Sequence, residues 1–313
     1  MASNLKLVKN YEDAQPSAVV GRYVAQIEAK RDQYGKDDIT YAHASMCQVF
    51  LPYHELDETF YEVKQGDLTL SIQGKDYFVN EDRTIKANRG VPYGTRARLL
   101  LYLMNEQAIL AGGPSFHLAD SFNDLCRKLY IPASGRSMQE IKTQLERLCT
   151  SSFSLEWKNS QTKGIKNFFI VQSLVTNGRS KNMSEYSKVD RDVKGFHVTL
   201  SDEYWNSVKD HAVPMDRRTI IALQNNAMCL DIYNWLTHRL YRIEKGKTVF
   251  ITWKLIKAQF GHTYAKMDSF KRDFRKNLQN VRGQYPTANI FEDKNKGFTL
   301  LPSTPPIGPQ VFF

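Results

Sequence analysis

The sequence predicts an α+β fold made of two tandem winged-helix domains, each a helix-turn-helix followed by a β-hairpin. Patterns typical of helix, helix, turn, helix and hairpin occur in that order twice along the 313 residues, without any repetition of the sequence itself. A long segment (177–195) with few apolar residues separates the two occurrences and is expected to be a loop. We expect an N-terminal polar and helical extension (1–45), domains over 46–212 and 213–302, and a Pro-rich tail (303–313).

Strands are expected at the start of the first domain. The apolar runs 49–54 and 60–63 predict two strands, and the alternation of Leu68, Leu70 and Ile72 predicts a third over 67–74. A weakly amphipathic stretch before them (18–34) is predicted as a helix.

Three helices and a hairpin follow in the first domain. The apolar run 96–110, which the turn VPYG introduces, and the segment 118–129, which Tyr-Ile-Pro stops, predict two helices. Segment 136–150 has apolar residues at helical spacings of three, four and three. The β-like runs 152–157 and 167–175 predict the hairpin, with a basic turn between them.

The last third of the chain repeats this order after a strand at 196–200, a helix from Ser201 and a boundary near Val213. Helical and β-like patterns alternate there as a second helix-turn-helix and hairpin require. Helices are predicted at 215–225, 227–243, 252–261 and 266–286, and strands at 249–253, 288–291 and 298–301.

Positive charge is concentrated in the same last third. Residues 216–313 hold 16 Lys and Arg against 7 Asp and Glu, a balance of +9, whereas the preceding residues hold 27 against 26. The whole chain has a formal net charge of +10. Such asymmetry points to a polyanionic partner, most simply double-stranded DNA, because Lys and Arg neutralise phosphates.

The helix predicted at 266–286 has the strongest candidate surface. Phe270, Phe274, Leu278 and Val281 recur at helical spacing and should be buried as one stripe. Cationic and amide side chains occupy the opposite face, where they can bind base edges or phosphates. We predict groove contacts by Arg272, Arg275, Lys276 and Gln279, and phosphate contacts by Lys271, Arg282 and the hairpin residues Lys294 and Lys296.

The corresponding helix of the first domain has a mixed outer face. Its predicted DNA-binding residues are Arg136, Gln139, Thr143 and Arg147. Glu140 and Glu146 lie among them, and acids repel phosphates. This face is therefore equally compatible with DNA contact and with a protein interface.

Signatures of catalysis, metal binding or cofactor binding are incomplete. Gly246-Lys247-Thr248 ends like a phosphate-binding loop, but Tyr241 stands where that motif needs glycine. The seven histidines have no zinc spacing, and Asp190 and Asp192 have no third carboxylate nearby. We expect no catalytic residues, no metal and no cofactor.

The cellular compartment is also predicted from the sequence. Four dispersed cysteines are typical of reduced thiols, and the start of the chain lacks the apolar core of a signal peptide. The longest fully apolar run, 99–104, is far too short to span a membrane. The expected location is the cytoplasm, without a membrane partner.

Several segments resemble the plasmid-encoded RepA replication initiators, in the order of that family. They are GDLTLSIQG, GVPYGTRARLLLYL, GRSMQEIKTQLERL, HAVPMDRRTIIALQNNAMCLDIYNWLTHRL, ITWKLIKAQFG and FKRDFRKNLQNVRGQYPTANI. The resemblance runs from about Val49 to Pro302, and on it the C-terminal recognition helix falls on Phe270 to Arg282. The family is similar to TrfA-type initiators, which have two winged-helix domains.

The resemblance implies an initiator that binds origin repeats (iterons), opens the duplex and recruits the host initiator and helicase. It also implies a switch between an active monomer and an inactive dimer. A transcriptional repressor with the same two modules is the alternative among binding proteins. A nicking or priming enzyme is the alternative among catalysts.

Overall fold

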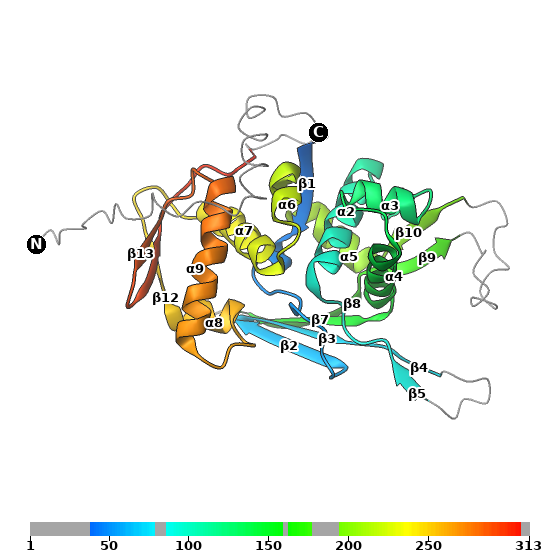
Figure 1. The fold of residues 1–313 in the computed structure, drawn as a ribbon, viewed down its shortest axis with the longest axis horizontal. Helices are drawn as coiled ribbons and strands as arrows, with labels where there is room; N and C mark the ends of the chain where they lie inside the picture. The colour runs from blue at the N-terminus through cyan, green and yellow to red at the C-terminus, as the bar shows by residue number, and fades with distance from the viewer. Residues whose placement is uncertain (1–37, 79–85, 159–161, 177–193, 308–313) are drawn as a thin grey trace, which may run out of the picture. The chain divides into compact units, whose positions relative to one another are not determined.

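A computed structural model describes residues 38–78, 86–158, 162–176 and 194–307. The chain divides into two compact units, one comprising Thr40–Pro214 and the other beginning at Met215 and including Ile39 (Figure 1). Mixed helix and strand confirm the α+β class. The helix predicted at 18–34 and nearly all of the polar segment 177–195 lie outside the described residues.

A four-stranded antiparallel sheet forms one layer of the first unit, in the order β2-β3-β7-β8. Its inward face follows the period-two alternation of the sequence, because Leu70 pairs with Val63 on one side and Leu155 on the other. Leu70 and Ile72 are fully buried. The strands are β2 (Phe60–Gln65), β3 (Leu68–Gln73), β7 (Ser152–Lys158) and β8 (Lys163–Phe169).

A three-stranded sheet, β6-β10-β9, lies in the same unit. Its strands are β6 (Ser115–Ala119), β10 (Phe196–Leu200) and β9 (Val171–Thr176). The run predicted as one strand at 167–175 is divided at the buried Ile170, so that β8 ends in one sheet and β9 begins in the other. A continuous apolar pattern cannot reveal that division, because the residues on either side of Ile170 keep β-like character.

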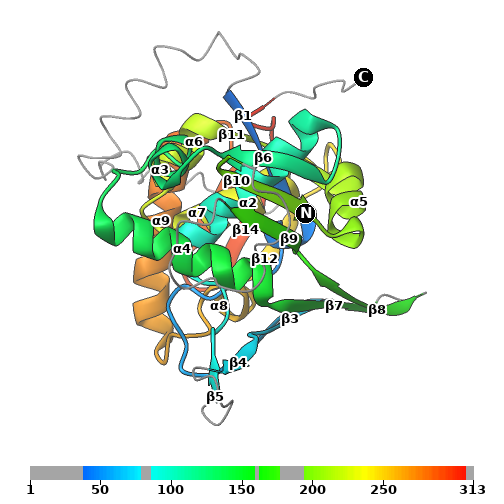
Figure 2. The same ribbon diagram turned by 90° about the vertical axis from the view of Figure 1, so that its right-hand side faces the viewer.

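Four helices complete this unit: α2 (Gly94–Ala111), α3 (Phe122–Lys128), α4 (Gly135–Thr150) and α5 (Asp202–His211). Helix α2 is buried on nearly all sides and contacts both α4 and β6. Helix α3 is shorter than predicted, because residues 118–119 end strand β6. The Ser121 hydroxyl accepts the Asp124 N–H and starts the helix there (Figure 2 shows α3 beside α4).

Two predictions for this unit are wrong, and one hairpin is additional. Residues 49–54 form no strand, because side chains of Tyr61 and Arg98 bind the carbonyl groups of Phe50 and Leu51 at 3.1 and 2.7 Å. The end of the predicted polar extension is the fully buried strand β1 (Ile39–His43), paired with β11 (Ala212–Asp216). A further hairpin, β4 (Asp76–Phe78) with β5 (Lys86–Asn88), was not predicted.

Over its described residues, the second unit has four α-helices and one three-stranded sheet. Helix α7 is buried along almost its whole length, as its apolar sequence requires. The sheet order is β12-β14-β13, with all pairs antiparallel. The elements are α6 (Arg217–Leu223), α7 (Ala227–Leu240), β12 (Val249–Thr252), α8 (Trp253–Phe260), α9 (Met267–Gln284), β13 (Ile290–Asp293) and β14 (Gly297–Leu300).

The buried His43 side chain makes the stability of the first unit depend on pH. The His43 ring stacks on Tyr204 at 5.3 Å, accepts the Ser45 N–H and contacts the Ser207 hydroxyl at 2.8 Å. Burial, together with the neighbouring His211 and Lys166, lowers the pKa of His43 to about 4. Only the unfolded chain therefore takes up a proton between pH 6.5 and pH 4, so stability is lost as the pH falls through that range.

We expect the free energy of unfolding to fall by about 2 kcal/mol more in the wild type than in His43→Gln when the pH drops from 7 to 5. Urea denaturation at both pH values measures the difference. The exposed His54→Gln is the matched control and should keep the wild-type dependence. Equal losses in wild type and His43→Gln would contradict the assignment.

Candidate nucleic-acid interface

Helix α9 separates an aromatic face from a cationic face. The predicted stripe is confirmed, since Phe270, Phe274 and Val281 are at most 1% exposed. On the other side, Arg272 and Lys276 are exposed and lie one turn apart. Arg272 also contacts its neighbour Asp273 at 3.0 Å, an exposed ion pair that phosphate can displace at little cost.

Arg275 is engaged within the protein. Its guanidinium forms an ion pair with Glu292 at 2.7 Å, and the Glu292 side chain is only 4% exposed. It also donates to the Lys294 carbonyl at 3.4 Å. Arg275 therefore ties α9 to β13, whereas the sequence predicted a base contact for it.

Trp253 is the centre on which these elements meet. Its ring packs edge-on against Phe274 and Phe298 at 5.8 and 4.9 Å. The cationic groups of Lys271 and Arg275 lie 5.4 and 5.0 Å from the ring centroid. The Trp253 indole N–H donates to the Lys294 carbonyl at 3.2 Å. One side chain thus joins α8, α9 and the C-terminal hairpin, by which we mean β13, β14 and the turn between them.

The turn of the C-terminal hairpin exposes Lys294 and Lys296. The Asp293 carboxylate accepts the N–H groups of residues 295 and 296, which closes the turn. Gly297 follows with φ of +151°, and a Cβ there would lie 2.0 Å from the Ile251 carbonyl oxygen. Only glycine fits this position, so the presentation of both lysines depends on it.

Asn277 fixes α9 against α7. Its side-chain oxygen accepts from Asn226 at 2.9 Å, and its amide nitrogen lies 3.1 Å from the Met228 sulfur. The remaining predicted residues of α9, Gln279 and Arg282, are half-buried. The sequence alone did not point to Asn277, because a polar residue beside a basic stripe looks like part of the exposed face.

Helix α4 of the first unit exposes a smaller polar face. Arg136 and Gln139 are exposed, and Thr143 is half-buried. Lys142 is also exposed on this helix. Lys142 was not among the DNA-binding residues predicted from the sequence, because it lies beside the helical stripe formed by the predicted residues and not within it.

Arg147 is not on that face, so this prediction is wrong. The residue is only 9% exposed. Its guanidinium pairs with Glu55, donates to the Val91 carbonyl at 3.3 Å and lies over the Tyr93 ring at 5.0 Å. The loop before α2 covers this end of α4, and helical periodicity carries no information about that loop.

Glu140 and Glu146, the two acids among the predicted DNA-binding residues of α4, each form ion pairs with arginine in the structure. Glu140 contacts both Arg136 at 2.9 Å and Arg96 at 3.2 Å. The hydrogen bond from Arg136, assisted by Arg96, lowers the pKa of Glu140. Glu146 pairs with Arg89 at 2.8 Å. Because arginines balance both acids, the repulsion of phosphates by these acids is reduced.

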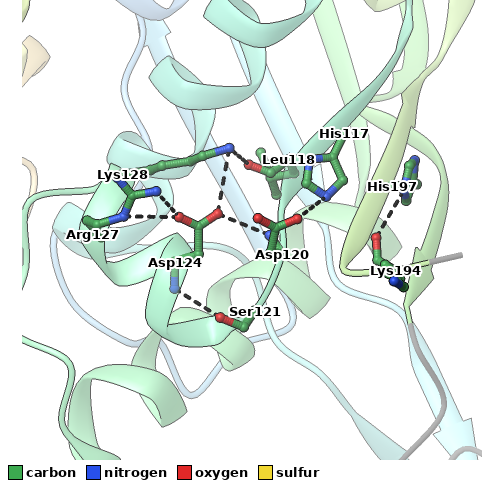
Figure 3. A network of polar contacts seen from close by, with 9 residues as sticks. All are labelled: His117, Leu118, Asp120, Ser121, Asp124, Arg127, Lys128, Lys194 and His197. Carbon is green, nitrogen blue, oxygen red and sulfur yellow. Dashed lines mark hydrogen bonds and ion pairs between the residues drawn. The ribbon is translucent and has the colours of Figure 1, made fainter.

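A polar network anchors α3, the helix that precedes α4 (Figure 3). The Asp124 carboxylate accepts the Asp120 N–H at 3.0 Å and lies 3.8 Å from the Lys128 ammonium group. Lys128 in turn donates to the Leu118 carbonyl of β6 at 2.7 Å. The first helix of the α3–α4 pair is thereby fixed to the sheet, and α4 is presented from a rigid base.

Over the described ranges, no group of three or more His, Cys, Asp or Glu side chains is placed to hold a metal ion. Among the helices that the structure describes, none combines the length and the apolar character needed to cross a membrane.

Comparison with solved structures supports the fold. A crystal structure of the selenomethionine derivative of RctB domains 2 and 3 superimposes with a TM-score of 0.50 at 10% sequence identity, covering 83% of this chain and 97% of that chain. A second crystal structure of RctB domains 2–3 superimposes with a TM-score of 0.49 at 10% sequence identity, covering 82% of this chain and 95% of that chain. At this identity the likeness shows the fold alone.

Comparison with protein families identifies the chain. No curated protein matches it. The family model described as "Plasmid encoded RepA protein" matches residues 91–255, which is 165 of the 313 residues. The resemblance carried by the sequence segments is therefore confirmed, and the chain belongs to the family of plasmid-encoded RepA proteins.

Proposed function

We propose that this protein initiates plasmid replication by binding repeated DNA sequences (iterons) at an origin. The observation that carries the proposal is the cationic face of α9 beside the lysine-bearing turn of the C-terminal hairpin. Membership in the RepA family and the charge of +9 over residues 216–313 support it.

The proposed docking geometry is that of a winged helix. Helix α9 enters the major groove as the recognition helix, and the C-terminal hairpin acts as the wing on adjacent phosphates. Arg272 and Lys276 contact base edges or phosphates, with Gln279 directed to adenine. Lys271, Arg282, Lys294 and Lys296 neutralise phosphates.

Arg275 has a positioning role in this proposal. Its ion pair with Glu292 sets the distance between recognition helix and wing. A base contact by Arg275 would require breaking that pair and leaving a carboxylate that is 4% exposed without its cation, which is costly.

The first unit supplies a second contact. Arg136, Gln139, Lys142 and Thr143 of α4 would meet a neighbouring groove in the active monomer. The alternative is an interface between two copies in an inactive dimer.

The later steps are duplex opening and recruitment of the host initiator and helicase, without catalysis. A repressor with the same two modules would bind the repeats but fail to open the origin. Incubating the protein with supercoiled origin plasmid and magnesium tests the enzymatic alternative, because a nicking enzyme would relax the plasmid.

Replacing the exposed cations of α9 should abolish sequence preference. We expect Arg272→Ala/Lys276→Ala to narrow the gap between repeat and scrambled duplex by roughly 1–3 kcal/mol for each lost base contact. Each lost phosphate contact should flatten the slope of log affinity against log salt by about 0.9. Fluorescence anisotropy at two salt concentrations measures both quantities.

The charge-matched control for this test is Lys64→Ala/Lys209→Ala, which removes two exposed cations from the first unit. It should bind the repeats with the wild-type preference. If Arg272→Ala/Lys276→Ala keeps the full preference for the repeats, α9 is not the recognition helix.

Replacing either partner of the Arg275–Glu292 ion pair should lower the free energy of unfolding. We expect Arg275→Ala and Glu292→Gln each to reduce the free energy of unfolding by about 1–3 kcal/mol, because each leaves a buried or half-buried polar group without its partner. A double-mutant cycle by urea denaturation should give a non-zero coupling energy. Independent, additive effects would show that Arg275 does not act through Glu292.

Removing the cations of α4 should weaken binding without changing its specificity. We expect Arg136→Ala/Lys142→Ala to flatten the salt slope by about 1.8 if both side chains contact phosphates. The preference for repeats should remain, since α9 carries it. An unchanged salt slope, together with loss of dimer in sedimentation, would assign α4 to self-association.

A further inference from the structure

The sheet of the second unit has an exposed aromatic face. Along β12 and β14, Ile251, Phe298 and Leu300 point inward and are at most 5% exposed. The alternate residues point outward, and among them Phe250 and Phe291 are 48% and 40% exposed. Two phenylalanine rings exposed on the outward face of a sheet forgo the stabilisation that burial would give, so their exposure calls for an explanation.

The two rings belong to one row across the sheet. Phe250 and Phe291 both pair with Thr299 of the central strand, one from each side. Because neighbouring strands lie about 4.8 Å apart, the two backbones are about 10 Å apart. The side chain between them is only a threonine, so neither ring is covered by a large neighbour within the row.

This aromatic row lies between two lysine-bearing turns. Lys245 and Lys247 are exposed in the turn before β12, and Lys294 and Lys296 are exposed in the turn between β13 and β14. Register places the turns at opposite ends, since Val249 pairs with Leu300 and Thr252 with Gly297.

Acidic residues offset only part of this charge. Glu244 pairs with Lys247 at 2.6 Å, and Asp293 lies 3.8 Å from Lys296. Each turn therefore retains one cation in excess of its acids. The row of rings is flanked by net positive charge on both sides.

We propose that this face binds single-stranded DNA, with bases stacked on Phe250 and Phe291 and phosphates near the two turns. Single strands offer the π faces of their bases, which a duplex hides, and aromatic rings beside cations are the usual combination that recognises them. The positive flanks favour a polyanion over an apolar protein partner.

The single-strand face is separate from the proposed duplex site. Glu292 points to Arg275 of α9, and its neighbour Phe291 must therefore point to the other side of the sheet. Helix α9 can hold duplex while this face remains accessible. The inference thus goes beyond iteron binding: it has its own aromatic residues and the Lys245–Lys247 turn, and shares with the duplex site only Lys294 and Lys296.

The test is a fluorescence-anisotropy titration of a labelled 20-nucleotide oligo-dT with the full chain. Oligo-dT cannot form a duplex with itself, so it reports single-strand binding alone. We expect Phe250→Leu/Phe291→Leu to weaken binding by roughly 5- to 100-fold for each stacked base, because leucine keeps the apolar area but has no π face. Phe250→Trp/Phe291→Trp should restore binding. Phe60→Leu, which changes an equally exposed ring in the first unit, should have no effect.

Wild-type affinity for oligo-dT in the double leucine variant would overturn the proposal. So would loss of self-association in sedimentation with oligo-dT binding unchanged, because the face would then be a protein interface. Repeat-containing duplex is titrated in parallel. Failure of the wild type to bind duplex, with oligo-dT binding intact, would defeat the proposed function and leave this inference standing.

Discussion

The packing of Trp253 is the interaction on which the second unit depends. Its ring packs against aromatic side chains of both α9 and β14. Its indole N–H donates to the Lys294 carbonyl in the turn of the C-terminal hairpin. Arg275 uses the same ring as a platform while it pairs with Glu292. These contacts hold α8, α9 and the C-terminal hairpin together, and in the proposed function the spacing of helix and hairpin would match DNA only while this junction is intact.

Cations in this protein have two distinct uses, which burial separates. Arg98, Arg147 and Arg275 are engaged by carbonyl groups or carboxylates and hold loops or strands in place. Their planar, multidentate guanidinium groups suit that role better than lysine does. Lys142, Lys276 and the lysines of the hairpin turn are exposed instead. The formal net charge of +10 therefore does not show which cations could meet phosphate.

In the two proposals made above, the two faces of the β12-β14-β13 sheet would bind two forms of DNA. The inward face supports α9, whose cations suit a duplex, and the outward face presents rings that suit unpaired bases. An initiator that opens a duplex produces single strands next to the repeats it holds. Placing both surfaces on one small sheet would keep the freed strand close to the protein without any movement between the two units.

The sequence by itself determined the α+β class, most helices of the described residues, the buried stripe of α9 and the family, because periodicity and composition are local and survive folding. It did not determine which polar residues face solvent. Arg147 has helical spacing on the outer face of α4, yet the loop at residues 90–93 covers it. Arg275 looks like its neighbour Arg272 until β13, 17 residues later, brings Glu292 beside it. The division of one apolar run at Ile170 between two sheets likewise depends on partner strands distant in sequence. Only tertiary structure decides such matters, because they depend on which distant segment lies opposite each side chain.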